Sequence, residues 1–343
     1  MIRVLVVDDS AVVRRIISDD LSKYEDIEVV GSAIDPYMAR EKIAKLRPDV
    51  ITLDIEMPRM DGLSFLEKLM AHHPLPVIIC SSLAPENSEN ALRALSLGAI
   101  EIVRKPGSQF SAPDVKNELV RAIRTGAKAR VFARRTEPRR ESVNIPSSLE
   151  TTHKIIAIGA STGGTQAIER VLTEFPVNSP GTIVVQHMPA GFTQSFANRL
   201  NQVCKIQVRE AKNGDIVAPG VALVAPGNHH LLLKRSGASY SVVVKDGPVV
   251  HFQRPSVDVM FQSVAQNAGK NAVGVILTGM GADGAKGLQM MHDNGAKTIA
   301  QDEDTCVVYG MPKEAVKLGA ADEILPLPQI PQAIFNSIRK LGA

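Results

Sequence analysis

Five short apolar runs recur along the first third of the chain, at residues 2–7, 27–30, 50–53, 77–80 and 100–103. Each run is separated from the next by a stretch with helical spacing, about ten to fifteen residues long. Alternating apolar runs and helical stretches are typical of parallel strands joined by helical crossovers. We therefore predict that residues 1–124 form an α/β domain with a (βα)5 pattern.

A second α/β pattern begins at residue 153. A β-branched run stops at a glycine-rich turn within residues 154–164, and a helical pattern follows over 165–172. Further apolar runs at 182–185 and 272–277 indicate more buried parallel strands. We predict that residues 153–343 form a doubly wound α/β domain built on a parallel sheet.

Three other segments of this second domain have a structural pattern. Residues 221–234 and 240–245 alternate in polarity around a Ser-Gly turn, which predicts a β-hairpin appended to the α/β core. Residues 256–267 begin with an N-cap serine and continue with helical spacing. Residues 330–341 are predicted to form a terminal helix.

The stretch between the domains, residues 125–152, is basic and poor in apolar side chains. Such a sequence buries too little apolar surface to offset the entropy lost on ordering, so we predict a flexible basic linker. A basic run can also bind a nucleic acid or an acidic partner. Phe132 is the one aromatic residue in this stretch, so stacking on bases is disfavoured and a plain linker is favoured.

Composition indicates an ordinary globular protein. Of the 343 residues 44% are hydrophobic and 22% are charged, and the net charge of +3 is too small to imply a nucleic-acid partner. No run approaches the ~20 apolar residues of a membrane span, and the first residues lack the pattern of a secretory signal. Three widely spaced cysteines argue against a disulfide framework or a zinc site. We expect a cytoplasmic protein.

Polar side chains follow the predicted strands of the first domain. They are Asp8, Asp9, Asp54, Ser81, Ser82, Arg104 and Lys105, and Pro106 follows Lys105. Parallel strands present their carboxyl ends at one edge of a sheet, so these residues should converge there. Clustered carboxylates repel one another, and a hard cation such as Mg²⁺ relieves that repulsion. A metal beside Asp54 also neutralises an incoming phosphoryl group, and Lys105 pairs with its oxygens, which makes Asp54 a candidate phosphoacceptor.

This set of residues resembles the response-regulator receiver domain over the whole first third of the chain. The resemblance implies that Mg²⁺ is bound by the side chains of Asp8, Asp9 and Asp54 and the backbone carbonyl of Glu56. It also implies that Ser81 and Lys105 are the switch residues. Receivers often carry an aromatic switch residue where this chain has Ile102, so the flip of an aromatic ring is not expected to be part of its signal.

Ser161 lies at the apex of the glycine-rich turn that opens the second domain. Gly159 and Gly163 flank it in a G-x-S-x-G pattern, whose small residues permit a strained turn that exposes a nucleophilic hydroxyl. The alternative is a phosphate-binding loop of a dinucleotide-binding domain. That alternative predicts an acidic residue at the end of the next strand, about twenty residues on. The chain has Gln186 and His187 there, which favours the nucleophile.

Asp283 completes a candidate triad from a third strand end, inside the glycine-rich loop 278–284. Ser161 would attack a carbonyl, His187 would take the serine proton, and Asp283 would fix the imidazole tautomer. Free backbone amides in the loop 278–281 would hold the oxyanion. The order Ser, His, Asp along the chain differs from that of α/β-hydrolases, so we do not predict that fold.

The combination of a receiver with four motifs resembles the CheB family of chemotaxis methylesterases over nearly all 343 residues. The motifs lie at 158–164, 186–188, 254–258 and 278–284. The resemblance implies the triad Ser161, His187 and Asp283, with Thr162 beside the nucleophile and the Met280 amide in the oxyanion hole. Family members commonly carry a histidine immediately before the Arg-Pro-Ser-Val-Asp segment. This chain has Gln253 at that position, which can form hydrogen bonds but cannot titrate.

The activity implied by this resemblance is acyl transfer on proteins. Glutamyl methyl esters of chemoreceptors would be hydrolysed with release of methanol, and selected glutamines would be deamidated. A chemotaxis histidine kinase would donate a phosphoryl group to Asp54 with Mg²⁺, and the hydrolysis would need no cofactor. The receptors would be the enzyme's one link to the membrane.

Two hypotheses of other classes remain for the function of the second domain. A dinucleotide-binding domain would need an acidic residue to hold the ribose, and this chain lacks one at the expected position. A DNA-binding output domain usually has about 100 residues and a helix-turn-helix. The second domain of this chain is nearly twice as long and has a βα pattern, which speaks against DNA binding.

Overall fold

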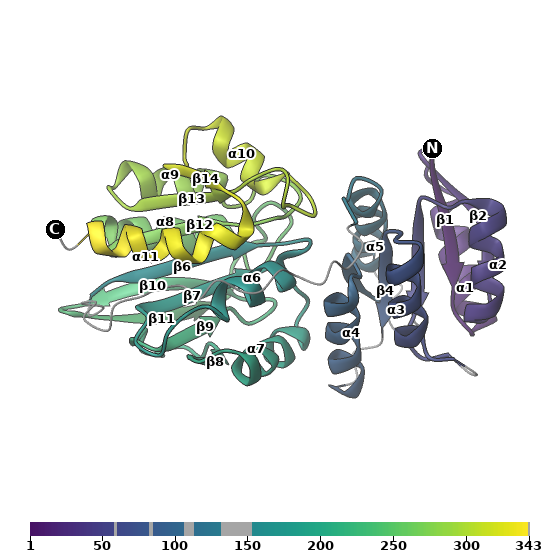
Figure 1. Ribbon diagram of the computed structural model, residues 1–343, viewed down its shortest axis with the longest axis horizontal. Helices are drawn as coiled ribbons and strands as arrows, with labels where there is room; N and C mark the ends of the chain where they lie inside the picture. Colours follow the sequence, from purple (N-terminus) through teal and green to yellow (C-terminus); the bar gives the residue numbers. More distant parts are fainter. Residues whose placement is uncertain (58–59, 82–84, 106–112, 132–152, 342–343) are drawn as a thin grey trace. The chain divides into compact units, whose positions relative to one another are not determined.

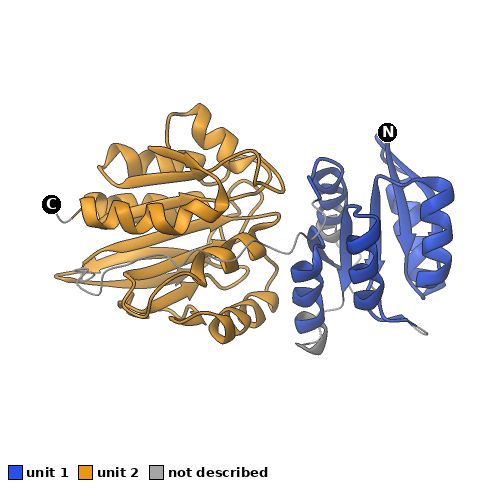
Figure 2. Cartoon of the chain, viewed as in Figure 1, with its two compact units in different colours: residues 1–138 blue, residues 139–343 orange. Residues whose placement is uncertain are grey.

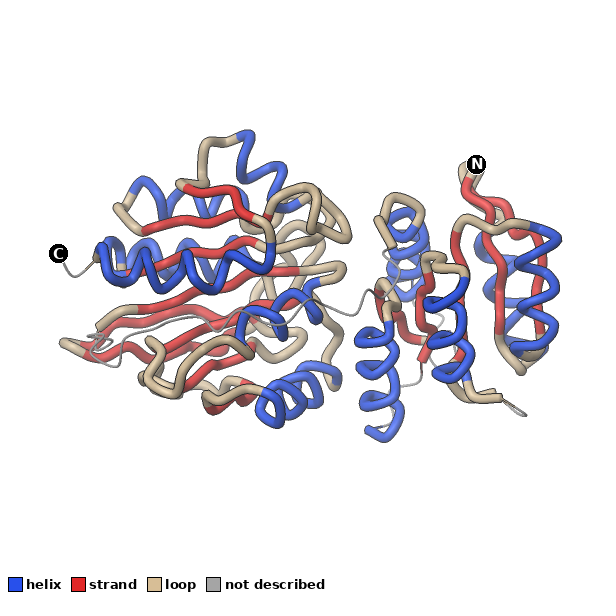
Figure 3. Tube along the Cα trace, viewed as in Figure 1, coloured by secondary structure: helices blue, strands red, loops and turns tan. Residues whose placement is uncertain are grey.

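The computed structural model describes residues 1–57, 60–81, 85–105, 113–131 and 153–341 (Figure 1). The chain divides into two compact units, Met1–Pro138 and Arg139–Ala343 (Figure 2). Each unit has a parallel sheet and its own helices (Figure 3). This confirms the predicted α/β class for both.

The first unit contains one five-stranded parallel sheet with the order β2-β1-β3-β4-β5. Its strands are β1 (Ile2–Val7), β2 (Ile27–Ala33), β3 (Val50–Asp54), β4 (Val77–Ser81) and β5 (Glu101–Arg104). Its helices are α1 (Ala11–Leu21), α2 (Pro36–Leu46), α3 (Gly62–His72), α4 (Pro85–Leu97) and α5 (Pro113–Gly126). The alternation confirms the (βα)5 prediction.

The strands of this unit form because their apolar runs can be buried on both faces. All five residues of β3 and all five of β4 are buried, including the polar Asp54 and Ser81 at their carboxyl ends. The helices begin at polar caps: the side chains of Asp35 and Asp61 accept amide hydrogens from the first turns of α2 and α3.

The end of α5 bears on the predicted boundary between receiver and linker. The helix ends at Gly126, so the predicted linker start at 125 falls in its last turn. Most of the predicted linker, residues 132–152, lies outside the described part of the chain.

The second unit contains a seven-stranded parallel sheet with the order β14-β13-β12-β6-β7-β9-β8. Its strands are β6 (Ile155–Ala160), β7 (Gly181–Gln186), β8 (Gln207–Glu210), β9 (Val221–Val224), β12 (Ala272–Ile276), β13 (Lys297–Gln301) and β14 (Glu323–Leu325). Its helices are α6 (Gly164–Leu172), α7 (Phe192–Val203), α8 (Val257–Asn267), α9 (Ala285–Asp293), α10 (Met311–Lys317) and α11 (Ile330–Lys340).

A two-stranded antiparallel hairpin, β10 (His230–Ser236) and β11 (Ser239–Lys245), is appended to this sheet as predicted. The prediction was wrong for residues 221–224, which form β9 of the main parallel sheet between β7 and β8. Three of the four side chains of β9 are buried, so this segment belongs to the core and not to a surface hairpin.

The strand order reverses in the middle of the sheet: after β6 the chain first adds strands on one side and later adds strands on the other. β6 lies between β7 on one side and β12 on the other, and all three strands are buried along their whole length. In open α/β sheets, ligands bind at the carboxyl ends of strands next to such a reversal. The loops that follow β6, β7 and β12 are therefore the expected place for a site.

Across the described ranges, no helix combines the length and the apolar character needed to cross a bilayer.

Candidate functional site

Ser161 stands between β6 and α6, and geometry explains the glycines around it. A Cβ on Gly159 would lie 2.2 Å from Cγ1 of Val257, and Gly163 has a left-handed φ of 77°. We expected an exposed serine, but Ser161 is only 5% exposed. The reason is the loop at Gly279, which packs so closely that a Cβ there would lie 2.7 Å from Cβ of Ser161.

Backbone hydrogen bonds join the three strand ends at this position. The amide of Ser161 donates to the carbonyl of Thr278 at 3.0 Å, and the amide of His187 donates to the carbonyl of Ala160 at 3.1 Å. These bonds bring the loops after β6, β7 and β12 to one edge of the sheet. Ser161, His187 and Asp283 therefore lie on adjoining loops.

His187 and Asp283 form a buried hydrogen-bonded pair. Nε2 of His187 lies 2.7 Å from Oδ2 of Asp283, and the two side chains are 5% and 2% exposed. Nδ1 of His187 is buried and has no hydrogen-bond partner among the described residues, so no bond to Ser161 is formed in this structure. Catalytic hydrogen bonds are often open until substrate binds.

The pairing fixes how the imidazole can act. A carboxylate accepts a hydrogen, so the neutral ring carries its proton on Nε2 and keeps a lone pair on Nδ1. Nδ1 of His187 is thus the atom able to take a proton, and Nε2 is the atom held by Asp283.

Asp283 is held by the start of α8 as well as by His187. Its carboxylate accepts hydrogen bonds from the Ser256 hydroxyl at 2.8 Å and from the amides of Val257 and Asp258 at 2.8 and 3.0 Å. Burial alone would raise the pKa of Asp283. The hydrogen bond and charge of His187, with those amides, outweigh burial and lower the pKa below its ordinary value. Asp283 is therefore ionised and rigidly oriented at neutral pH.

Sequence reasoning did not assign this supporting role to residues 256–258. The available signal was Ser256 as an N-cap, since a helix amino terminus favours a carboxylate.

The oxyanion prediction needs a correction for half of its loop. The amide of Thr278 donates to Oε1 of Gln301 at 2.8 Å, and the amide of Gly279 donates to the carbonyl of Val308 at 3.0 Å. Both are committed to the fold, because they hold this loop against its neighbours. These two amides are therefore not available as oxyanion donors, and the role of the Met280 amide stays a prediction.

Thr162 is buried beside Ser161. Its carbonyl accepts a hydrogen bond from the Thr278 hydroxyl at 3.0 Å, which links the serine turn to the same loop.

The first unit gathers its predicted polar residues at the carboxyl edge of its sheet. Asp8, Asp9 and Asp54 each place a carboxylate oxygen within 4.8 Å of the others. Nζ of Lys105 lies 2.6 Å from Oδ2 of Asp54 and 3.2 Å from Oδ2 of Asp8. The amide of Glu56 donates to Oδ1 of Asp54 at 3.1 Å. Three hard oxygen donors this close together fit a Mg²⁺ ion.

The structure also locates Ser81 and Ile102 of the receiver. Ser81 is buried at the end of β4, and its carbonyl accepts a hydrogen bond from the amide of Lys105 at 3.0 Å. Ile102 is a buried core residue of β5. Ser82 and Pro106 lie outside the described residues.

Comparison with known proteins bears on both units. The family model for CheB methylesterase matches residues 156–334, and that for the response regulator receiver domain matches residues 4–115. A protein of Syntrophus aciditrophicus named protein-glutamate methylesterase/protein-glutamine glutaminase 2 is 58% identical over 340 residues, covering 98% of this chain and 99% of the relative.

The chain belongs to the CheB methylesterase family.

Two further family members support this membership. A Chromobacterium violaceum protein, also named protein-glutamate methylesterase/protein-glutamine glutaminase 2, is 53% identical over 352 residues, covering 97% of this chain and 99% of the relative. The solved catalytic domain of Thermotoga maritima CheB methylesterase is 39% identical, covers 53% of this chain and 97% of that chain, and has a TM-score of 0.52. Neither a dinucleotide-binding nor a DNA-binding output agrees with this family.

The family pattern also draws attention to His251, which was not singled out from the sequence. The resemblance drew attention to Gln253, where the family commonly has a histidine. In the structure an imidazole comes from His251, two positions earlier, whose Nε2 lies 3.1 Å from Oδ2 of Asp258. Asp258 in turn neighbours Asp283, because their carboxylate oxygens and the His251 ring lie within 4.8 Å of one another.

Burial of the Asp54 carboxylate predicts how the folding stability of the receiver depends on pH. Burial, opposed by Lys105 and reinforced by Asp8, raises its pKa from 3.8 to about 6. The unfolded chain therefore ionises before the folded one, and folding stability is lost as pH rises from about 4 through about 6. At pH 7.5 without Mg²⁺, Asp54→Asn should stabilise the receiver by up to ~3 kcal/mol, at roughly 1.4 kcal/mol for each pKa unit.

This prediction is checked by urea unfolding of the full chain in EDTA at pH 4 and pH 7.5. The advantage of Asp54→Asn should shrink toward zero at pH 4. Asp9→Asn is the matched control, because Asp9 is exposed. An Asp54→Asn advantage that is equal at both pH values would contradict the burial argument.

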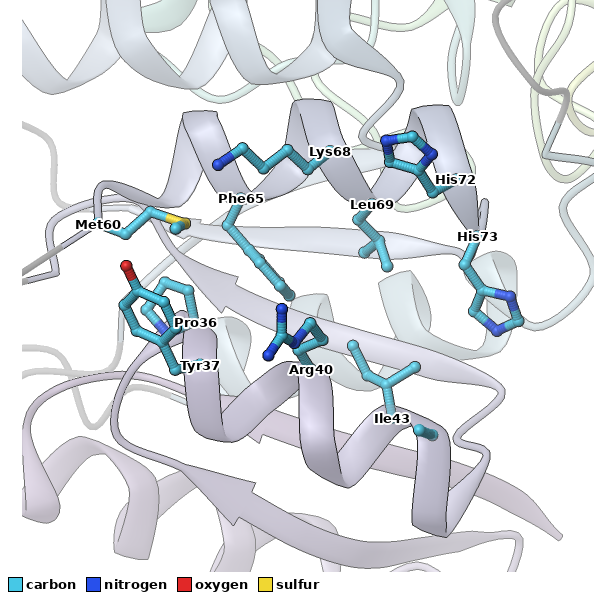
Figure 4. Close-up of a pocket in the computed structure, with 11 residues that line it drawn as sticks. Pro36, Tyr37, Arg40, Ile43, Met60, Phe65, Lys68, Leu69, His72 and His73 are labelled. Carbon is cyan, nitrogen blue, oxygen red and sulfur yellow. The ribbon is translucent and has the colours of Figure 1, made fainter.

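A separate hollow of about 590 Å³ lies between α2 and α3 of the first unit (Figure 4). Phe65, Leu69 and Ile43 give it apolar walls, and Arg40 and Lys68 supply basic groups. None of the predicted site residues lines it, so we assign it no part in the family activity.

Proposed function

We propose that this chain removes methyl groups from glutamyl methyl esters and deamidates glutamines on chemoreceptors, through a Ser161, His187 and Asp283 triad under control of receiver phosphorylation. The observation that carries the proposal is the buried pair of His187 and Asp283 on loops that adjoin Ser161. Membership of the CheB family supports the choice of substrate.

The geometry supports the following sequence of steps. Oγ of Ser161 attacks the acyl carbon while Nδ1 of His187 takes the hydroxyl proton. Asp283 holds the Nε2 hydrogen and stabilises the imidazolium that forms. His187 returns the proton to the leaving methoxide or amide, which departs as methanol or ammonia. Water then attacks the acyl-serine by the same proton route and frees the glutamate.

The oxyanion that forms in each step needs donors that are fixed in advance. The Met280 amide is the candidate carried by the family resemblance, and Thr162 supports the turn that presents Ser161. A single oxyanion donor typically contributes about 3–4 kcal/mol to transition-state stabilisation. Ester and primary amide pass through the same kind of tetrahedral intermediate, so one serine site can serve both reactions.

In the receiver, the side chains of Asp8, Asp9 and Asp54 and the carbonyl of Glu56 would hold Mg²⁺. The ion would offset the negative charge of the phosphoryl group that a chemotaxis histidine kinase donates to Asp54. Lys105 already contacts Asp54 and would pair with a phosphoryl oxygen. Ser81 ends β4, the strand that pairs with β3 and its Asp54, and would supply the switch hydroxyl.

Competition between the two substrates tests the single-site proposal. A receptor carrying glutamine at the modified positions should inhibit methanol release from the methylated receptor competitively, with an inhibition constant equal to its own KM for ammonia release. The same receptor with glutamate at those positions controls for inhibition by docking alone. If the glutamine form inhibits no better than the glutamate form, the two reactions do not share one serine.

A further inference from the structure

A tight turn with an unusual conformation lies next to the triad. Val250 and Gln253 exchange both backbone hydrogen bonds, at 3.0 and 2.8 Å, so His251 and Phe252 form a two-residue loop between them. Both loop residues have left-handed φ angles, of 50° and 61°. Such a loop ordinarily uses asparagine and glycine, because a Cβ is strained there. The fold holds two large side chains in this conformation instead.

Contacts on both sides fix the position of this turn. Nε2 of His251 lies 3.1 Å from Oδ2 of Asp258, whose Oδ1 accepts the amide of Gly287 at 2.6 Å. After the turn, the guanidinium of Arg254 donates to Oδ1 of Asn228 at 2.6 Å. Because the His251 ring and the Asp283 carboxylate belong to one cluster within 4.8 Å, the turn is anchored directly beside the triad.

The side chain presented by this turn is Phe252, which is 91% exposed. The other phenylalanines described in the second unit are all at most 1% exposed, and they are Phe175, Phe192, Phe196, Phe261 and Phe335. Val249, just before the turn, is also 59% exposed and enlarges the apolar surface. An aromatic ring held in water by a strained and anchored turn gains nothing for the fold of this unit, so a contact beyond the unit is its natural use.

We propose that Phe252 is a contact for the protein substrate, binding an apolar patch of the receptor segment that carries the methylated or amidated side chain. The inference rests on the proposed triad, since the turn is placed by His251 against Asp258 and Asp283. The reaction acts on a side chain of a folded protein, so residues beside the reacting side chain must approach the rim of the site. Aromatic residues are the commonest anchors at such interfaces.

The test compares two substrates of the full-length enzyme: a methylated receptor, and p-nitrophenyl acetate as a small ester that carries no receptor segment. Phe252→Asn removes the ring and keeps the turn, because asparagine tolerates a left-handed φ. We expect kcat/KM for the receptor to fall about ten-fold, mainly through KM, as is common when an interface anchor is truncated. Activity on p-nitrophenyl acetate should stay within about two-fold of the parent.

Val177→Ala is the control for loss of an exposed apolar residue. Val177 is 69% exposed and precedes the amino-terminal end of β7, whereas the triad loops follow the carboxyl ends of the strands. Neither substrate should therefore be affected. An equal loss on both substrates in Phe252→Asn would overturn the proposal and make the turn a support for the triad. An unchanged KM for the receptor would overturn it as well.

Failure of the triad itself has a different signature. Ser161→Ala that still hydrolyses p-nitrophenyl acetate at the parent rate would contradict the proposed nucleophile, whatever Phe252 does. A Phe252 effect confined to the receptor, together with a Ser161→Ala loss on both substrates, supports both proposals.

Discussion

Replacing Ser161 by alanine should lower receptor demethylation and deamidation by roughly 10⁴-fold or more, because it removes the proposed nucleophile of the acyl-enzyme. His187→Gln should cost a similar factor, since the serine then has no base. The double variant should be only slightly slower than either single variant, because residues of a triad act as a unit. Methanol and ammonia release under single-turnover conditions measure all three.

Folding should be intact in these variants, so the loss is chemical. Ser239→Ala, at an exposed serine that begins β11, is the matched control and should keep full activity. Thermal unfolding midpoints close to that of the parent would confirm intact folding. If the two single losses multiply in the double variant, Ser161 and His187 act independently and the triad is wrong.

Asp283→Asn should lower turnover by about 10³- to 10⁴-fold while the substrate still binds. Asp283 can only accept hydrogens, so it keeps the imidazole proton on Nε2 of His187 and leaves Nδ1 open. An asparagine amide can donate to Nε2, which moves the ring proton to Nδ1 and removes the base. The amides of Val257 and Asp258 would also lose a charged acceptor, so some loss of stability is expected as well.

The control for this substitution is Asp322→Asn. Asp322 also accepts a backbone amide, that of Thr298 at 2.8 Å, but it follows α10 and lies outside the triad loops. It should reduce stability slightly and leave turnover unchanged. Nitrogen-15 NMR of His187 reports the tautomer directly. Asp283→Asn with turnover within ten-fold of the parent would contradict the assigned role of Asp283.

Much of the architecture could be predicted from the sequence, because parallel strands buried on both faces leave continuous apolar runs. The polar residues that end those runs marked both sites: Asp54 closes β3, and His187 follows β7 directly. Parallel strand order then brings such residues to one edge, whatever their separation along the chain. Boundaries were less accurate by a few residues, as at the end of α5.

The errors arose where tertiary partners decide the outcome. Residues 221–224 were predicted as part of a hairpin strand, yet they are the unbroken apolar run Val-Ala-Leu-Val, and the neighbours that bury them make them part of the main sheet. The amides of Thr278 and Gly279 were expected to be free, but their acceptors Gln301 and Val308 come from distant segments. His251 was missed because its left-handed backbone, which carries the ring to Asp258, has no signature in a residue other than glycine or asparagine.

Covalent labelling tests the central claim most directly. The full-length enzyme is treated with a fluorophosphonate, which reacts with activated serines, and the modified peptide is mapped by mass spectrometry. The account predicts a single stoichiometric adduct on Ser161, with labelling lost in Ser161→Ala and strongly slowed in His187→Gln. An adduct on another serine, or undiminished labelling of Ser161→Ala, would show that the nucleophile lies elsewhere and contradict the account.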